Sequence, residues 1–191
     1  MSKRSYLVRN IPKIIITVLI LAVLIYIAFF WSNTAIKKRL PIKFEEHVTK
    51  YAMEYELDKY LVYSIICAES GFDNEAESRV GAKGLMQMMP GTAIWLNEKY
   101  QLNINAENLF DAEINIKLGC CYLSYLMERF DNEIPLVLAA YNGGEGNVKK
   151  WLNDEKYSKD GKTLYYIPYE ETRNYVKKVS TYFELYKDIY G

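Results

Sequence analysis

The sequence predicts a mainly α-helical domain that follows a single transmembrane helix. Residues 14–31 contain no charged side chain. From Phe44 onward, apolar residues recur at spacings of three and four, which is typical of amphipathic helices. Aspartate, proline and glycine stand where such helices would begin and end. This pattern leaves little room for a β-sheet.

The uncharged run is the first predicted element. It ends in Trp31, and Thr17 is its one clearly polar side chain. Its length just reaches the roughly 18 to 20 apolar residues that cross a bilayer. It exceeds the apolar core of a cleavable signal peptide, about 7 to 15 residues. We therefore predict an uncleaved anchor at 14–31, a short cytoplasmic tail at 1–13 and a stalk at 32–42.

The orientation of this anchor does not follow from charge alone. Basic residues flank the run in equal number, so the positive-inside comparison is nearly balanced. They are Lys3, Arg4, Arg9 and Lys13 on one side and Lys37, Lys38, Arg39 and Lys43 on the other. After residue 36 the chain carries 20 basic and 24 acidic residues, a net charge of −4. No basic stripe is visible, which argues against a nucleic-acid partner.

Histidine and cysteine are too few and too poorly spaced to predict a metal site. His47 is the single histidine, and no two cysteines have zinc-ligand spacing. Cys67, Cys120 and Cys121 are interpreted as small buried hydrophobes. The sequence leaves open a disulfide from Cys67 to one of the adjacent pair. No cofactor is expected.

The predicted domain covers residues 43–191, and its helix boundaries follow from capping residues. Asp58 suits the N-cap of a helix that Gly71 is placed to end. Pro90 suits the first position of the next helix. Other helices are expected at Phe44–Tyr55, Asp111–Phe130, Pro135–Gly143, Val148–Leu152 and Pro168–Tyr186. On the helix after Asp111, the inward face is predicted to hold Ile114, Leu118, Cys121, Tyr122, Tyr125, Leu126 and Phe130. Residues 73–89 are expected to form a loop with at most a short hairpin, and residues 153–163 a mobile surface loop.

Glu69 is the candidate acid. Val62, Ile65, Ile66 and Glu69 share one helical face, so the carboxyl continues an apolar stripe. Desolvation disfavours the charged form and should raise the pKa of Glu69. A carboxyl that stays protonated near neutral pH can act as a general acid. The alternative is a solvated, inert glutamate at a frayed helix end.

A glycine-marked loop follows this helix and adds binding chemistry. Residues 81–90 read Gly-Ala-Lys-Gly-Leu-Met-Gln-Met-Met-Pro. The glycines permit tight turns or close approach of the backbone to a ligand. Gln87 offers both a hydrogen-bond donor and an acceptor, and the methionines offer adaptable apolar contacts. Methionines alone would more commonly be core residues.

The set of motifs resembles the lytic transglycosylases of the soluble type, whose fold is related to goose-type lysozyme. The matching segments are Glu69-Ser70, Gly84-Leu85-Met86-Gln87, Ala140-Tyr141-Asn142 and Glu171-Thr172-Arg173 with Tyr175-Val176. They occur in family order over residues 45–185. Gly143 stands where alanine is more usual. The set is specific, although each motif alone would be weak evidence.

This resemblance implies a lysozyme-like fold and a role for each matching residue. Glu69 would be the single catalytic acid and base. Ser78 would help position the acetamido group of the substrate. Gln87, Met89, Tyr141 and Asn142 would line the glycan groove. Glu171 and Tyr175 are further candidates that could reach the cleft or serve the structure alone. Tyr165 and Tyr166 join Tyr141 as candidates for stacking against sugar rings.

The resemblance also implies a reaction and a location. Glu69 would protonate the oxygen between N-acetylmuramic acid and N-acetylglucosamine, then act as base on the C6 hydroxyl. A 1,6-anhydro ring would close without consuming water, and the proximity of the internal hydroxyl can stand in for a second carboxylate. Peptidoglycan would be the partner, and the anchor would place the domain on the cell-wall side of the membrane.

Two alternatives stay open. Asp73, Glu75 or Glu77 could be a second carboxylate and make the chain a hydrolytic muramidase, although a loop position favours solvated side chains. A non-catalytic domain that grips glycan for an envelope or secretion complex would also fit the anchor. The process served and the choice between cleavage at chain ends or inside strands do not follow from the sequence.

Overall fold

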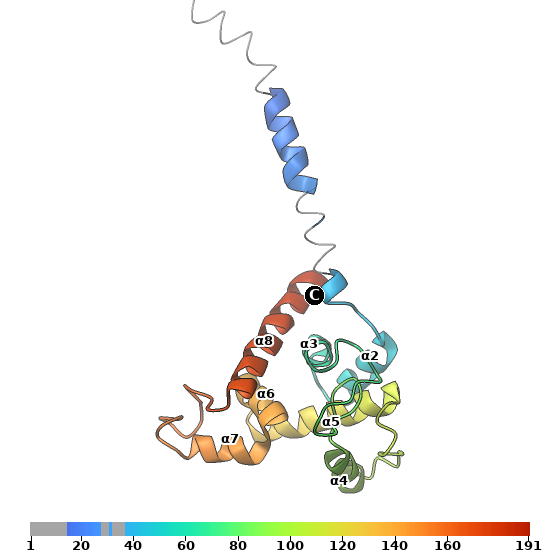
Figure 1. Cartoon of the computed structure of the whole chain (residues 1–191), viewed down its shortest axis with the longest axis vertical. Helices are drawn as coiled ribbons and strands as arrows, with labels where there is room; N and C mark the ends of the chain where they lie inside the picture. The colour runs from blue at the N-terminus through green and yellow to red at the C-terminus, as the bar shows by residue number, and fades with distance from the viewer. Residues whose placement is uncertain (1–14, 28–30, 32–36) are drawn as a thin grey trace, which may run out of the picture. The chain divides into compact units, whose positions relative to one another are not determined.

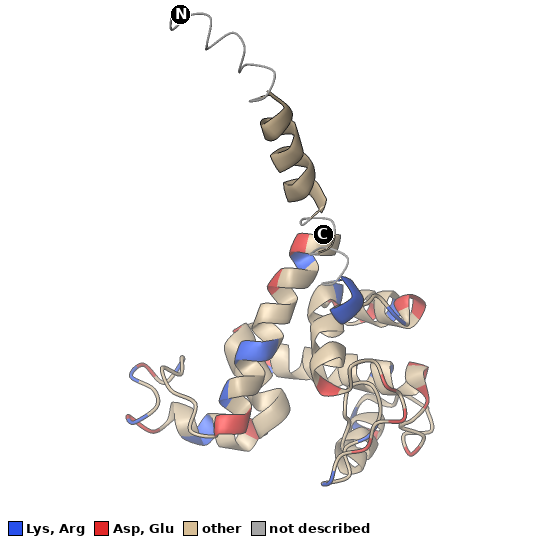
Figure 2. Ribbon diagram, turned by 45° about the horizontal axis from the view of Figure 1, so that its top comes forward, with Lys and Arg blue, Asp and Glu red and all other residues tan. Residues whose placement is uncertain are grey.

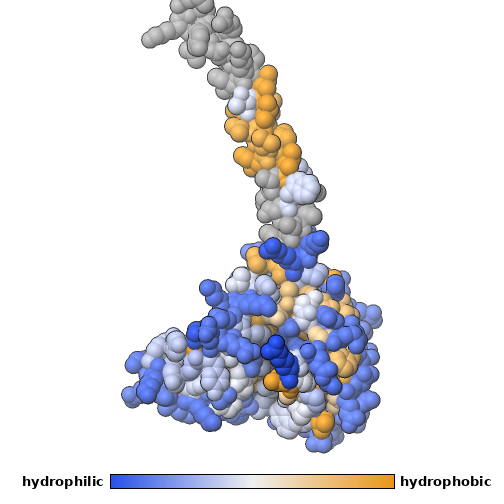
Figure 3. All heavy atoms as spheres, in the orientation of Figure 1, coloured by the Kyte–Doolittle hydropathy of each residue, from blue (hydrophilic) through white to orange (hydrophobic). Residues whose placement is uncertain are grey.

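The computed structural model describes residues 15–27, 31 and 37–191. The chain forms two units, Met1–Pro41 and Ile42–Gly191, which we describe separately (Figure 1). In the first unit, residues 15–27 are helical and their apolar side chains are exposed (Figure 3). No helix among the described residues is long and apolar enough to cross a bilayer. The predicted tail, residues 14 and 28–30 of the predicted span, and residues 32–36 of the stalk lie outside the described residues.

The second unit is helical, as predicted. Its helices are α2 (Glu45–Glu54), α3 (Lys59–Glu69), α4 (Pro90–Tyr100), α5 (Ala112–Arg129), α6 (Ile134–Gly143), α7 (Glu145–Leu152) and α8 (Glu170–Tyr190). The predicted loop between α3 and α4 is confirmed, and its described β-structure consists of two isolated bridges, Glu77 with Lys83 and Lys83 with Met88. Acidic and basic residues are interspersed over the helices and loops in the view of Figure 2.

Capping aspartates and a proline explain three of the helix starts. The side chain of Asp58 accepts a hydrogen bond from the Tyr60 amide, and that of Asp111 accepts one from the Ile114 amide. Pro90 is the first residue of α4. The last helix begins two residues later than predicted. Tyr169 has extended backbone angles, and its carbonyl accepts the first helical bond from Arg173. Proline fits an extended segment as readily as a first helical turn, so Pro168 does not mark the start.

The α5 helix is more enclosed than an amphipathic surface helix. It packs against α2, α4 and α6, while α3 packs extensively on α8 (Figure 1). Neighbours on several sides bury Asn115, Ile116 and Leu123, which the predicted inward face omitted. Ile114, Tyr122 and Tyr125, which were predicted to face inward, are only half-buried. The prediction for the two tyrosines was wrong because their contacts with Tyr141 of α6 and Trp95 of α4 leave part of each side chain uncovered.

The cysteines are packing residues, as interpreted. Cys120 and Cys121 are buried in α5, whereas Cys67 is half-buried on α3 and interacts with Tyr186 of α8. None of the three, all within the described part of the chain, forms a disulfide. The bridge that the sequence left open is therefore not made.

Candidate active site

Glu69 is the last residue of α3 and stands above an apolar layer. Val62, Ile65 and Ile66, which share its helical face, are fully buried. Burial is the largest influence on the carboxyl and raises the pKa of Glu69 to about 7. The direction and the main cause of this shift are those that the sequence predicted. Near neutral pH a large fraction of this side chain is protonated and can donate a proton.

One face of α8 meets this carboxyl. Glu171, Tyr175 and Lys178 are spaced by four and three residues, so they share that face. The Tyr175 hydroxyl interacts with the Glu69 carboxyl and lowers its pKa, as does the charge of Lys178, while the charge of Glu171 raises it. Tyr175 Oη is buried, and no described residue meets both the distance and the angle of a hydrogen bond with it. Lys178 Nζ also donates a 2.8 Å hydrogen bond to the Ala68 carbonyl.

Asn115 of α5 holds the loop that carries the methionines. Its Oδ1 accepts from the Met86 amide at 2.7 Å, and its Nδ2 donates to the carbonyls of Lys83 and Leu109 at 2.9 and 2.8 Å. Gly84 lies against the Asn115 side chain with a left-handed φ of +76°, and a Cβ at this position would lie 2.3 Å from Asn115 Nδ2. These three bonds explain why a fully buried asparagine is present, because one side chain provides hydrogen-bond partners for three backbone groups.

Ser70 joins the same loop to α3. Its hydroxyl donates to the Leu85 carbonyl at 2.8 Å and accepts from the Phe72 amide at 3.1 Å. Because Ser70 follows Glu69 directly, these bonds fix the loop relative to the carboxyl. The serine of the Glu-Ser motif is therefore a structural link between α3 and the loop.

Gln87 has a structural role in addition to its predicted position in the groove. Its backbone is left-handed, with φ 48°. Its Nε2 donates to the carbonyls of Ala76 and Gly84, both at 3.0 Å. The amide nitrogen therefore holds the loop. The amide oxygen accepts no hydrogen bond from the described residues and is the group that Gln87 can offer to a ligand.

Four of the predicted groove residues lie around one pocket. Gln87, Met89, Tyr141 and Asn142 line a hollow of about 280 Å³ together with Met88, Thr92, Tyr122, Gly143 and Gly144. The Tyr141 hydroxyl donates to the Met86 carbonyl at 2.9 Å. Burial, followed by the Glu69 charge, raises the pKa of Tyr141. Tyr141 therefore connects the pocket with Glu69 and Tyr175.

Ser78 is not among the residues that line this pocket. Its Oγ accepts a 2.9 Å hydrogen bond from the Ala82 amide and closes a turn on which Gly81 also lies. Tyr165 and Tyr166 are exposed on the segment before α8 and do not line the pocket either. Sequence reasoning missed Asn115, Tyr122 and Lys178. Of these, only Asn115 had a sequence signal, as a polar residue within an apolar helical stretch.

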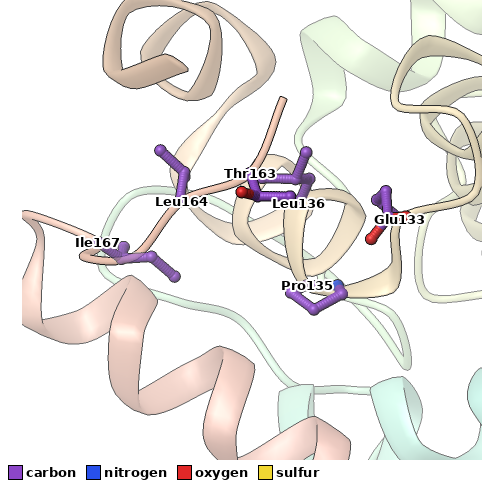
Figure 4. Close-up of a pocket in the computed structure, with 6 residues that line it drawn as sticks. All are labelled: Glu133, Pro135, Leu136, Thr163, Leu164 and Ile167. Carbon is purple, nitrogen blue, oxygen red and sulfur yellow. The ribbon is translucent and has the colours of Figure 1, made fainter. Parts of the chain in front are cut away.

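A second pocket lies at the opposite end of α6. It has a volume of about 110 Å³ and is lined by Glu133, Pro135, Leu136, Thr163, Leu164 and Ile167 (Figure 4). Its walls are mostly apolar, and it contains none of the residues predicted for the site. The candidate active site is therefore the region of Glu69 and the pocket beside Tyr141.

The loop acids are not among the charges that act on the pKa of Glu69. Asp73, Glu75 and Glu77 are exposed. Asp73 accepts from the Glu75 amide, and Glu77 lies 3.7 Å from Lys83 Nζ. The carboxylate whose charge acts on Glu69 is Glu171, which comes from α8. One protonated carboxyl beside an amide- and aromatic-lined pocket suits acid-catalysed cleavage of a neutral polymer.

The comparisons with known proteins agree with this arrangement. The family model described as the transglycosylase SLT domain matches residues 46–165. The chain belongs to the transglycosylase SLT domain family. It is 33% identical over 164 residues to the soluble lytic murein transglycosylase of Salmonella typhimurium, covering 84% of this chain and 25% of that protein. It is 29% identical over 178 residues to the membrane-bound lytic murein transglycosylase F of Desulfosudis oleivorans, covering 78% and 37%.

Solved structures confirm the lysozyme-like helical fold of this SLT domain. The 70-kDa soluble lytic transglycosylase of Escherichia coli matches with a TM-score of 0.73 at 32% identity, covering 81% of this chain and 26% of that one. The complex of the 70-kDa soluble lytic transglycosylase with bulgecin A matches with a TM-score of 0.74 at the same identity. The chain spans about a quarter of the length of these soluble relatives.

The raised pKa of Glu69 makes a prediction about stability. In the unfolded chain the carboxyl ionises near 4.5, whereas in the folded SLT domain it keeps its proton up to about pH 7. Between these pH values the folded state binds more protons at Glu69 than the unfolded state does. The contribution of Glu69 to the free energy of unfolding therefore falls as pH rises and is constant above about pH 7. Glu69→Gln removes this loss. We expect parent and variant to unfold alike near pH 4, and the variant to gain up to about 3 kcal/mol near pH 8.

Thermal unfolding of both proteins at the two pH values checks this expectation. A stability difference that is the same at both pH values would show that Glu69 is not desolvated. Glu75→Gln serves as the control, because Glu75 is exposed on the loop after α3 and lies outside the candidate active site.

Proposed function

We propose that this chain is a peptidoglycan lytic transglycosylase that cleaves the β-1,4 bond between N-acetylmuramic acid and N-acetylglucosamine and leaves a 1,6-anhydromuramoyl end. The observation that carries the proposal is the partly buried Glu69 side chain, whose pKa of about 7 lets one group donate and later accept a proton near neutral pH. The names of the relatives, which are murein transglycosylases, support the substrate class.

The proposed reaction uses Glu69 twice. The protonated carboxyl donates its proton to the glycosidic oxygen, and the leaving sugar departs as an alcohol. The resulting carboxylate then takes the proton of the muramic C6 hydroxyl while that oxygen attacks C1. The ring closes, and Glu69 regains the proton with which it began. No water is consumed, because the attacking hydroxyl belongs to the substrate.

Neighbouring side chains support both protonation states of Glu69. Lys178 and Tyr175 stabilise the carboxylate that forms after the first transfer, while burial and Glu171 stabilise the acid that precedes it. In the proposed complex Gln87 offers its amide oxygen to the glycan, and Met89 and Asn142 contact it from the pocket wall. Ser78 stays a proposed substrate residue. It would donate a hydrogen bond to the glycan through its hydroxyl proton, since its Oγ already accepts a bond from the Ala82 amide.

Glu171 favours a second candidate, a hydrolytic muramidase. Its carboxylate is the one that acts electrostatically on Glu69, and a second carboxylate could activate a water molecule for attack. The two reactions give different products. Hydrolysis leaves reducing ends that contain one oxygen from solvent, whereas ring closure leaves anhydro ends that contain none.

Product analysis on purified sacculi tests the proposal. We expect the protein to release 1,6-anhydromuropeptides without incorporation of oxygen from heavy-oxygen water. Reducing ends that carry solvent oxygen would show that the protein is a hydrolase and not a transglycosylase. In that case Glu171→Gln should abolish hydrolysis. Binding to sacculi without release of any fragment would instead identify a glycan-gripping domain.

We also propose that residues 14–31 anchor the chain in the cell membrane as a single span, with the SLT domain on the cell-wall side. The absence of charge over this run supports it. Two relatives of the domain are named membrane-bound lytic murein transglycosylases, F and C. Membrane fractionation tests it: the full chain should sediment with membranes, and residues 37–191 alone should not.

A further inference from the structure

A row of aromatic side chains leads out of the pocket beside Tyr141. The rings of Tyr141 and Tyr122 are 5.4 Å apart between centroids, those of Tyr122 and Tyr125 6.3 Å, and those of Tyr125 and Trp95 5.1 Å. We call these four residues the aromatic row. They come from α6, α5 and α4, so the fold brings them together from distant parts of the chain.

The aromatic row continues the pocket in one direction. Tyr122 and Thr92 line the pocket. Tyr125 and Trp95 lie three residues further along α5 and α4, and they meet edge to face. Both helices therefore extend the pocket wall by about one turn, away from the inner end at Tyr141.

The outer end of the row is accessible and has polar edges. Trp95 is 37% exposed, whereas Trp151 of the same domain is buried at 6%. The Tyr125 hydroxyl donates to a Glu145 carboxylate oxygen at 2.8 Å. Lys99 Nζ lies 5.1 Å from the Trp95 ring centroid and 4.7 Å from that of Tyr125, and it makes no salt bridge with the described residues. Apolar faces with hydrogen-bonding edges match the surface of a sugar ring.

We propose that Trp95 and Tyr125 form an outer sugar subsite of the groove, with Lys99 placed to meet the acidic peptide substituent of a muramoyl residue. The kind of glycan rests on the proposed function. The lysine is held over the rings by cation–π attraction in the absence of an acidic partner. A carboxylate on the substrate would give it a stronger partner at the edge of the same subsite.

Calorimetric binding to a Glu69→Gln protein tests the subsite without requiring catalysis. N-acetylglucosamine trimer and hexamer are the probes. In this background we expect Trp95→Ala to weaken hexamer binding by about tenfold and to leave trimer binding unchanged, because only the longer chain reaches the outer end. Trp95→Phe should keep most of the affinity. Tyr165→Ala is the matched control, since Tyr165 is an exposed aromatic residue outside the row.

The outcomes separate the subsite from the proposed reaction. Equal hexamer affinity with and without Trp95 would overturn the subsite, and so would equal weakening of trimer and hexamer, which would indicate a general change of the groove. Lys99→Met should weaken binding of peptide-bearing glycan fragments and leave the hexamer unaffected. Absence of anhydro products from the parent would refute the transglycosylase while leaving these binding results intact.

Discussion

Glu69→Gln is expected to reduce glycan cleavage by at least about 10³-fold, because the amide can neither donate a proton to the glycosidic oxygen nor accept one from the C6 hydroxyl. The side chains are nearly equal in size, so the apolar layer of Val62, Ile65 and Ile66 stays packed. Release of soluble fragments from sacculi measures the effect. Glu75→Gln is the control and should retain parental activity, since its carboxyl is exposed.

The pH dependence of cleavage by the parent protein is a second test of the role of Glu69. Cleavage should fall as pH rises through about 7, because the first step needs the protonated acid. An activity that stayed constant from pH 6 to pH 9, or a Glu69→Gln protein that kept a tenth of parental activity, would remove Glu69 from the catalytic role.

Asn115→Ala is expected to lower the free energy of unfolding by about 3 to 5 kcal/mol. The substitution removes three hydrogen bonds and leaves the Met86 amide and the Leu109 carbonyl without partners in a buried place, while the Lys83 carbonyl keeps the bond from the Met88 amide. For a domain of this size the melting temperature should fall by about 10 °C. Glycan binding should weaken as well, because the released loop carries Gln87 and Met89.

Asn174→Ala provides the control for Asn115. Asn174 is exposed on α8, and its replacement should change stability by no more than about 0.5 kcal/mol. Chemical denaturation of the three proteins measures both effects. A loss below about 1 kcal/mol for Asn115→Ala would mean that the loop is held by other contacts, such as the bond from Ser70 to Leu85.

Most of the helices could be predicted because their boundaries depend on local chemistry. Asp58, Asp111 and Pro90 act within one helical turn of their own positions, so the sequence around each contains the whole signal. The prediction failed for Tyr122 and Tyr125 because the exposure of a helical residue depends on which helices pack around it. Nothing in the sequence near α5 specifies that α4 and α6 leave these rings beside a pocket.

The position of the candidate acid was predictable for the same local reason. Val62, Ile65, Ile66 and Glu69 lie on one helix, so the periodicity of a single segment places the carboxyl on an apolar face. The motif of residues 81–90 indicated a ligand loop, since glycine marks backbone that other residues cannot follow. The charged and hydroxyl groups that adjust Glu69 come from α8, more than a hundred residues away, and their approach required the packing of α3 on α8.

The sequence by itself determined the helical class, the motifs of the SLT domain and the apolar helical face on which the candidate acid Glu69 lies. These are properties of residue spacing along one or two turns of chain. The tertiary structure decided which side chains surround that acid, that Asn115 clamps the loop, that Gln87 uses its amide nitrogen within the protein, and that Tyr122 belongs to a pocket. Desolvation and hydrogen bonding depend on the distances between segments, and those distances exist only once the helices have packed.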